Sequence, residues 1–278
     1  MLPPVLVLSH DCDQLRGNDL YTQLVRLVRF AKPLARKSPP AFAQLRHIAR
    51  NARHPRRWFF DDALAMARLE RSFGFRSAFY FLNGAGGRLG ARSGSPIVAE
   101  FARALPAEVE LGVHYTYGYA HDPARLAAQI AELEQLTGRA IRAGRAHYLR
   151  FNPESDFAVI EGQGIRVDES LGFASANGYR SGFAGAYRVA GHDVVEVPLQ
   201  FMDSNTVPRG TATDVLAMVR ETEAVGGVVT MLFHPGAFDT PEAAELKGLY
   251  ERYLRHFSER GYRSLLPSEL GDLVRAAA

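Results

Sequence analysis

The sequence predicts an α/β protein with parallel strands, arranged as a (β/α) barrel or as a doubly wound sheet. The chain has 278 residues, of which 47% are hydrophobic, and this is enough to bury one large core within a single domain, 1–278. Beyond residue 57, short apolar runs of strand length alternate with amphipathic segments of helical period, which is typical of parallel strands joined by crossover helices. Both architectures gather functional side chains at the carboxyl ends of their strands.

Apolar runs and helical periodicity place the individual elements along the chain. We expect strands in the apolar run that ends near His10 and at 76–83, 109–117, 142–151, 166–174, 192–203 and 227–236. We expect helices at 59–73, 95–105, 122–138, 156–165, 211–226 and 243–261. The clearest helix is 122–138, because Asp122 is a good N-cap, Pro123 suits the first helical position and Gly138 suits the end.

Composition excludes several classes of protein. The single cysteine, Cys12, leaves no disulfide framework within the chain and no multi-cysteine metal site. The N-terminal residues lack the basic and apolar regions of a signal peptide, and no apolar run approaches the roughly 18–20 residues that cross a bilayer. We therefore expect a cytoplasmic protein. The net charge of +3 is mild and by itself indicates no partner, and the sequence carries no signal for an oligomeric state.

A basic segment, residues 20–57, interrupts the alternation after the first strand. No acidic residue lies between Asp19 and Asp61, and apolar residues recur in this interval at helical spacing, so we expect an insert of two short amphipathic helices. Its ten basic residues are Arg26, Arg29, Lys32, Arg36, Lys37, Arg46, Arg50, Arg53, Arg56 and Arg57. The insert is either a solvated helical excursion or a patch for an anionic substrate, lipid headgroups at a membrane surface or nucleic acid.

Reactive side chains gather at or near the ends of the expected strands. A carboxylate and two histidines that converge from different strands can hold a divalent metal and leave coordination positions open, as a hydrolytic site requires. A second carboxylate beside the metal can then act as general base, and a separate histidine as general acid. The residues in these positions are Asp11, Asp13, His114, Arg145, His147, Arg150, Asp168, Glu196, Asp203 and His234.

Five motifs, LSHDCD, ELGVHYTY, RAHYLRF, DESLGFASANGYRSG and LFHPG, occur in the order of the motifs of the polysaccharide deacetylase (NodB-like) superfamily. The chain resembles that superfamily from residue 5 to about 240, apart from the basic segment. More narrowly, it resembles the HYLRF-bearing branch, in which Asp-x-Asp replaces adjacent aspartates at the first motif, and the WbmS-type proteins of O-antigen gene clusters. The resemblance implies a distorted (β/α) barrel and metal-dependent removal of an acyl group from a sugar amine.

The same resemblance implies roles for individual residues. These are Asp11 as general base, Asp13 and His114 as metal ligands, His234 as general acid, and Arg145 and Asp168 as the residues that hold and tune the base. One metal position departs from the pattern, because the superfamily has a second histidine four residues after the first, where this chain has Gly118.

Two histidines are candidates for that missing ligand. His121 lies just before the helix that begins at Pro123. His147 lies two residues beyond Arg145, and on an extended strand the two side chains would point to the same side. The sequence leaves both candidates open.

The combined prediction is a metal-dependent sugar N-deacylase, with Zn²⁺ as the first choice of metal and Ni²⁺, Co²⁺ or Fe²⁺ as alternatives. The expected substrate is a small sugar on a nucleotide or lipid phosphate in O-antigen biosynthesis, and no nucleic-acid partner is expected. Candidate substrate-binding residues are Tyr148, Arg150, Arg180, Glu196 and Asp203. Two alternatives stay open: a metal-independent glycoside hydrolase or cyclic amidase, and a non-catalytic carbohydrate-binding or recruiting barrel.

Overall fold

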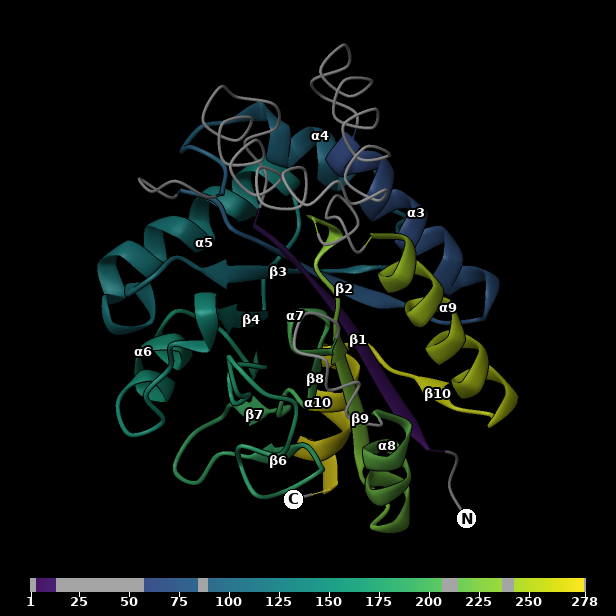
Figure 1. Ribbon diagram of the computed structural model, residues 1–278. Coiled ribbons are helices and arrows are strands. Elements are labelled where there is room, and N and C mark those ends of the chain that lie inside the picture. Colours follow the sequence, from purple (N-terminus) through teal and green to yellow (C-terminus); the bar gives the residue numbers. More distant parts are fainter. Residues whose placement is uncertain (1–3, 14–57, 85–89, 207–214, 237–242, 278) are drawn as a thin grey trace, which may run out of the picture.

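A curled, ten-stranded sheet with helices on its outside forms the protein (Figure 1). The structure is a computed structural model that describes residues 4–13, 58–84, 90–206, 215–236 and 243–277. The strands follow the order β6-β7-β5-β4-β3-β2-β1-β9-β8, and β10 pairs with β1. Every pair is parallel except β6 with β7. Among the described strands none joins β8 to β6, so the sheet is an open, curled form of the predicted barrel.

The elements have the following bounds. The strands are β1 Val5–Cys12, β2 Ser77–Phe81, β3 Glu110–Tyr115, β4 Ala143–Ala146, β5 Val167–Asp168, β6 Tyr187–Arg188, β7 Val195–Glu196, β8 Phe201–Met202, β9 Val228–Leu232 and β10 Arg263–Ser264. The helices are α3 Trp58–Ser72, α4 Pro96–Ala104, α5 Pro123–Thr137, α6 Asp156–Gly162, α7 Asp203–Thr206, α8 Val215–Ala224, α9 Ala243–Glu259 and α10 Pro267–Ala277. Two short 3₁₀ turns are η1 Tyr119–His121 and η2 His147–Leu149.

Strand β1 lies between β2 and β9 and presents different chemistry on its two faces. Leu6 and Leu8 belong to an outer hydrophobic cluster with α3 and α9, whereas Val7 belongs to the cluster inside the curl. Because side chains alternate along a strand, Ser9 and Asp11 continue the inner row. The alternation therefore carries the Asp11 carboxylate into the interior of the sheet.

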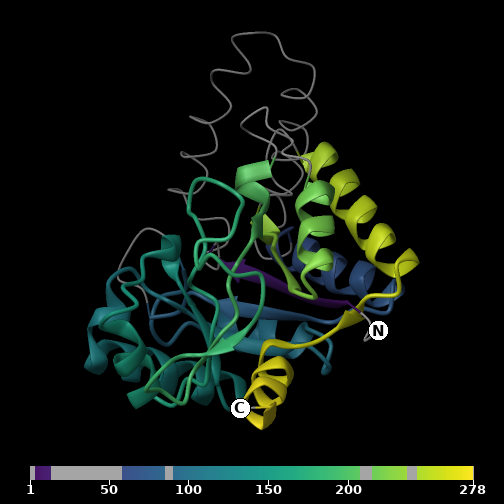
Figure 2. The same ribbon diagram turned by 90° about the horizontal axis from the view of Figure 1, so that it is seen from below.

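The helices cover the outside of the curled sheet in two groups, with α5 and α6 on the left and α3 and α9 on the right in Figure 1, and Figure 2 shows the same arrangement from below. On one side, buried residues of α4, α5 and α6 pack in one cluster against β2 and β3. On the other side, α3, α8 and α9 pack against β1 and β9. A third cluster fills the inside of the curl, where Leu270 of α10 packs with Val167 and Val195 of β5 and β7. These layers fix the strands whose carboxyl ends carry the site.

The helix predicted at 122–138 is confirmed as α5. The Asp122 side chain accepts a hydrogen bond of 3.1 Å from the backbone N–H of Arg125, as an N-cap should. Gly138 ends the helix with a φ of 68°, in the left-handed region that glycine adopts without strain.

Several predicted strands are shorter than their apolar runs. The run 142–151 gives only β4, because the backbone turns left-handed at Tyr148 and Leu149 and cannot continue a strand. The run 192–203 divides into β7 and β8, with Pro198 in the gap, where it cannot donate a ladder hydrogen bond. The two-residue strands β6 and β10 are too short for a periodic signal. Helix α10 is not predicted either, although Pro267 at its start is a helix signal.

The predicted basic insert, 20–57, lies outside the described residues, so its helices and its binding role stay predictions. Within the part of the chain that the structure describes, no helix is both long enough and apolar enough to span a bilayer.

Close packing between β3 and β4 gives a stability prediction. A Cβ atom added at Gly144 would lie 2.4 Å from the Tyr115 ring, which is 1% exposed. We expect Gly144→Ala to lower the free energy of unfolding by about 1–3 kcal/mol, because the ring has no free volume to move into. The matched control is Gly162→Ala in α6, where an added Cβ meets nothing within 4 Å, and stability should be unchanged or slightly higher. Denaturant unfolding of both variants checks this, and equal stabilities would contradict the packing argument.

Candidate metal centre and active site

Side chains from four parallel strands converge at the carboxyl end of the sheet. Strands β1, β3, β4 and β9 are neighbours or near neighbours in the sheet order, so the residues at their carboxyl ends meet on one edge. The residues brought together are Asp11, Asp13, His114, Arg145, His147 and His234.

Asp13, His114 and His147 form a group with the geometry of a metal site. One ligand atom from each residue lies within 4.8 Å of the other two. Nε2 of His114 is 3.2 Å from Oδ1 of Asp13, and Nε2 of His147 is 3.9 Å from the same oxygen. Within the described residues, Asp13 Oδ1 and His147 Nε2 are buried and make no hydrogen bond of good geometry. Such atoms are costly to leave unsatisfied, and a shared cation would satisfy both.

Asp13 and His147 have protonation states that suit a cation. Burial lowers the pKa of His114, but Asp11 and Asp13 outweigh it and raise the pKa, so a bound cation would replace a proton there. Burial raises the pKa of Asp13, but the close contact with His114 and the charge of His234 outweigh it and bring the pKa down to about 2. Burial, with the charge of His114, lowers the pKa of His147 to about 4, so its imidazole is neutral at pH 7. Nδ1 of His114 lies 2.9 Å from the Arg145 carbonyl oxygen and must donate to it, which directs Nε2 toward Asp13.

Arg145 is completely buried and holds Asp11. Its Nη1 donates to Asp11 Oδ1 at 2.7 Å, its Nη2 donates to Ser9 Oγ at 2.6 Å, and Nη2 lies 3.1 Å from Glu169 Oε2. The guanidinium also lies over the Tyr80 ring, 4.9 Å from its centroid. Burial raises the pKa of Asp11, but Arg145 outweighs it and the pKa is lowered, so Asp11 is ionised at neutral pH.

Asp168 does not lie where the motif comparison places it. The carboxylate beside Arg145 is that of Glu169, the next residue, because the side chains of consecutive residues point to opposite faces. Asp168 instead accepts hydrogen bonds from the Tyr115 hydroxyl and the Ser170 backbone N–H, both at 2.9 Å. It lies opposite Glu196 across β5 and β7. Burial raises the pKa of Asp168 to about 6, and burial with the charge of Asp168 raises the pKa of Glu196 well above its usual range.

His234 follows β9 and is held by Asp203. Its Nδ1 lies 2.8 Å from Asp203 Oδ1, and its backbone N–H donates to Asp203 Oδ2 at 2.9 Å. Its Nε2 faces the centre, 4.0 Å from Asp11 Oδ2 and 3.9 Å from Asp13 Oδ2. Burial lowers the pKa of His234, but Asp203 and the two nearby carboxylates outweigh it and raise the pKa to about 10. His234 is therefore an imidazolium at neutral pH and has a proton to donate.

The structure distinguishes between the two candidates for the third metal ligand. His121 lies in η1 and is paired with Asp156, with 2.7 Å between Nδ1 and Oδ1. It does not approach Asp13 or His114. His147 reaches both, although not by the predicted strand geometry, because β4 ends at Ala146 and His147 begins the turn η2.

The candidate substrate-binding residues divide into two groups. Tyr148 and Arg150 are exposed and lie directly beyond His147. Glu196 is 0% exposed and cannot contact a substrate, so its predicted role is wrong. Asp203 is 1% exposed and committed to His234. Arg180 donates to three backbone carbonyls, those of Leu149, Phe151 and Gly172, and acts on the backbone around the site.

Sequence patterns did not identify Glu169, Ser9 and Tyr80, which surround Arg145. Ser9 and Tyr80 lie within apolar runs and Glu169 lies next to Asp168, and the sequence alone does not show which of two neighbouring strand residues points inward. A second buried network also escaped prediction. His10 Nε2 lies 2.7 Å from Glu70 Oε1, and the hydroxyls of Ser77 and Tyr250 donate to the same carboxylate.

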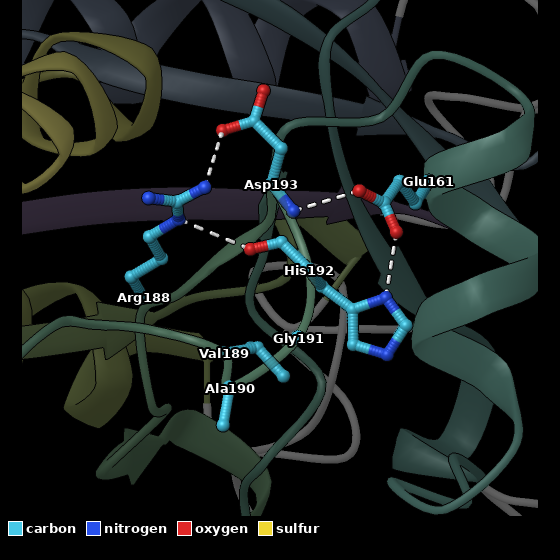
Figure 3. A pocket seen from close by; sticks show the side chains of 7 residues that line it. All are labelled: Glu161, Arg188, Val189, Ala190, Gly191, His192 and Asp193. Atoms are coloured by element: carbon cyan, nitrogen blue, oxygen red, sulfur yellow. Dashed lines mark hydrogen bonds and ion pairs between the residues drawn. The ribbon is translucent and has the colours of Figure 1, made fainter.

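A surface hollow of about 540 Å³ lies apart from this centre (Figure 3). It is lined by Glu161, Arg188, Val189, Ala190, Gly191, His192 and Asp193. As Figure 3 shows, its polar groups bond to one another: His192 Nδ1 lies 2.6 Å from Glu161 Oε2, and the Asp193 N–H donates to Glu161 Oε1 at 2.7 Å. None of the predicted site residues lines it.

No protein-family model matches the chain, and no curated protein matches its sequence. Among solved structures, the chain is similar to a Mycobacterium smegmatis protein assigned to the polysaccharide deacetylases. The TM-score is 0.60 at 15% identity, over 99% of this chain and 91% of that chain. It is also similar to part of the 4-alpha-glucanotransferase from Thermococcus litoralis, with a TM-score of 0.54 at 12% identity, over 97% of this chain and 40% of that chain. The predicted fold, a distorted barrel of the polysaccharide deacetylase type, is confirmed.

The His234–Asp203 pair predicts a pH dependence. The folded pKa of His234, about 10, exceeds the unfolded value of about 6.5, so the pair stabilises the fold fully below pH 6.5 and this contribution is lost as pH rises toward 10. Asp203→Asn should move the titration of His234 to lower pH and remove that dependence. NMR titration of the imidazoles in metal-free protein measures it, with His192 as the internal control. An unshifted His234 titration in the variant would exclude Asp203 as the cause.

Proposed function

We propose that the protein is a metal-dependent hydrolase that removes an acyl group from the amino group of a sugar. The observation that carries this proposal is the meeting of three units at one edge of the sheet. These are the Asp13–His114–His147 group, the Asp11–Arg145 pair and the His234–Asp203 pair. Together they supply metal ligands, an ionised carboxylate and a protonated imidazole, which is the set that amide hydrolysis requires.

The residues present fit a divalent metal. Asp13, His114 and His147 would hold it, because one carboxylate oxygen and two imidazole nitrogens suit Zn²⁺, Co²⁺, Ni²⁺ or Fe²⁺ and leave positions open. The unsatisfied buried atoms of Asp13 and His147 support this assignment. When bound, the metal would supply Lewis acidity toward the amide oxygen and the attacking water.

Asp11 and His234 carry the proton transfers in this proposal. Asp11 is ionised and held by Arg145, so it can accept a proton from the attacking water. His234 is protonated and held by Asp203, so it can donate a proton to the leaving amine. His234 Nε2 and Asp11 Oδ2 are 4.0 Å apart, so both could act on the same reacting group.

For the substrate, we propose a small N-acyl sugar carried on a nucleotide or a lipid phosphate in the cytoplasm, in O-antigen biosynthesis. The support is the order of the sequence motifs, their similarity to the HYLRF-bearing and WbmS-type branch, and the ten basic residues of the insert. Arginine-rich segments recognise phosphates by bidentate hydrogen bonds, and the same segment could contact an anionic membrane surface.

The alternatives receive less support from the site. A glycoside hydrolase needs two carboxyls that flank the substrate, but Glu196 is buried and Asp203 is bound to His234. A purely binding barrel has no use for a protonated imidazole beside an ionised aspartate. The similarity to a glucanotransferase concerns the fold alone.

The metal assignment is tested by occupancy. Asp13→Ala, His114→Ala and His147→Ala should each bind well below one Co²⁺ per chain after removal and replacement of metal, because each removes one ligand. His121→Ala is the matched control and should keep full occupancy, because His121 is paired with Asp156. Elemental analysis and the visible spectrum of Co²⁺ measure this. Full occupancy in His147→Ala would remove His147 from the ligand set.

The base assignment is tested by Asp11→Asn. The variant should keep its metal but lose about 10²–10⁴-fold in turnover, the usual contribution of a positioned proton acceptor. The measurement is acyl release from the N-acyl sugar that the wild-type protein hydrolyses fastest, in a panel of free and phosphate-linked sugars. Near wild-type turnover at full metal content would refute the role of Asp11.

A further inference from the structure

Two exposed tyrosines stand beside the candidate metal centre. Tyr117 follows β3 and is 54% exposed, and Tyr148 follows His147 and is 62% exposed. Their ring centroids are 6.3 Å apart at an interplanar angle of 72°, so the two rings form a corner. Aromatic side chains that are this exposed leave apolar surface in contact with water, which is unfavourable. Two such side chains next to each other are typical of a binding surface.

The backbone beneath Tyr148 is strained. Tyr148 and Leu149 have φ values of 60° and 52°, and they are the described non-glycine residues with positive φ. This conformation costs free energy for residues with a Cβ atom, and it persists only where surrounding contacts impose it. Arg180 supplies such contacts, because its guanidinium donates to the carbonyl oxygens of Leu149 at 3.3 Å and Phe151 at 3.4 Å. The fold therefore uses strain to hold an aromatic ring in solvent.

The ring of Tyr148 is connected directly to the metal ligands. It stacks on His147, with 4.0 Å between centroids and 19° between planes, and His147 in turn lies 5.0 Å from His114. Because one face of Tyr148 covers His147 and the residue is 62% exposed, the opposite face is open. A flat apolar group that packs on that face would be separated from His147 only by the Tyr148 ring.

A positive charge lies on the same surface. The guanidinium of Arg150 lies over the Tyr117 ring, 5.0 Å from its centroid, and the side chain is exposed. Within the described residues, Arg150 forms no ion pair. The corner of two rings thus has a cation at its side that no nearby carboxylate neutralises.

We propose that Tyr148, Tyr117 and Arg150 form a platform that binds the sugar ring and an anionic substituent of the substrate. The C–H face of a pyranose packs on the open face of Tyr148, and a phosphate or carboxylate on the same molecule lies against Arg150, which Tyr117 orients. This proposal rests on the proposed function for the expectation of a sugar substrate. It adds that Arg150 binds the anionic group close to the reacting sugar and that Tyr148 selects and orients the ring.

The test measures binding to metal-free full-length protein, so that it does not depend on hydrolysis. The probes are N-acetylglucosamine, N-acetylglucosamine 1-phosphate and the corresponding N-acetyl uronic acid, observed by ligand NMR or calorimetry. Tyr148→Ala should weaken all three by about tenfold or more, because the stacking surface is lost. Arg150→Gln should weaken only the anionic probes, by about tenfold, and the phosphate and uronic-acid arms show which anion is preferred.

Two further variants separate binding from stability. Tyr148→Gly should lose the same affinity while its melting temperature does not fall, because glycine adopts a φ of 60° without strain. Phe183→Ala is the matched control, because Phe183 is an exposed aromatic residue, 54% exposed like Tyr117. It lies away from the platform: the carbonyl of the next residue, Ala184, accepts a hydrogen bond from Val228 at the amino end of β9, whereas the platform lies at the carboxyl ends of the strands. Unchanged affinity in the Tyr148 variants, an equal loss in Phe183→Ala, or equal effects of Arg150→Gln on neutral and anionic probes would overturn the platform. If the wild-type protein binds the probes as expected but shows no turnover or binds no metal, that result would count against the proposed function and not against the platform.

Discussion

The site depends on one buried cation, the guanidinium of Arg145. A charge that is 0% exposed is tolerated only when acceptors surround it, and removing one partner of such a pair costs about 3–5 kcal/mol. Here the acceptors come from two other strands: Ser9 and Asp11 from β1, and Glu169 directly after β5. The same interaction therefore holds strands together across the curl and fixes the ionised state and orientation of Asp11.

The buried carboxyls around this cation differ in the direction of their pKa shifts. Asp11 lies next to Arg145 and its pKa is lowered, despite complete burial. Asp168 on β5 and Glu196 on β7 have no cation in contact among the described residues, and burial raises both pKa values. Glu169 does contact Arg145, but burial outweighs that contact and its pKa is raised. A sequence motif does not reveal these differences, because they arise from the balance of burial against nearby charge.

His114 and His234 are both oriented by a hydrogen bond at Nδ1, but the chemistry of the bonding partner differs. In each, the hydrogen bond at Nδ1 directs Nε2 toward the centre. The partner of His114 is a neutral carbonyl oxygen, which suits a ligand that must offer a lone pair. The partner of His234 is a carboxylate, which raises the pKa to about 10 and keeps the proton on the ring. Burial lowers the pKa of His114, but Asp11 and Asp13 outweigh it and raise the pKa, so a divalent cation bound there would displace a proton from the ring.

The sequence by itself determined the alternation of strands and helices, the caps of α5, and the placement of Asp11, Asp13, His114 and His234 at strand ends. These follow from local signals: apolar period, capping residues, and polar residues where an apolar run stops. Tertiary structure alone decided between His121 and His147, between Asp168 and Glu169, and against any contact of Glu196 with substrate. Each of these depends on where a strand ends or on which face of the sheet a side chain lies, and a shift of one residue moves the side chain to the other face. The register of a strand is set by pairing with strands distant in sequence, so it is defined only in the folded sheet.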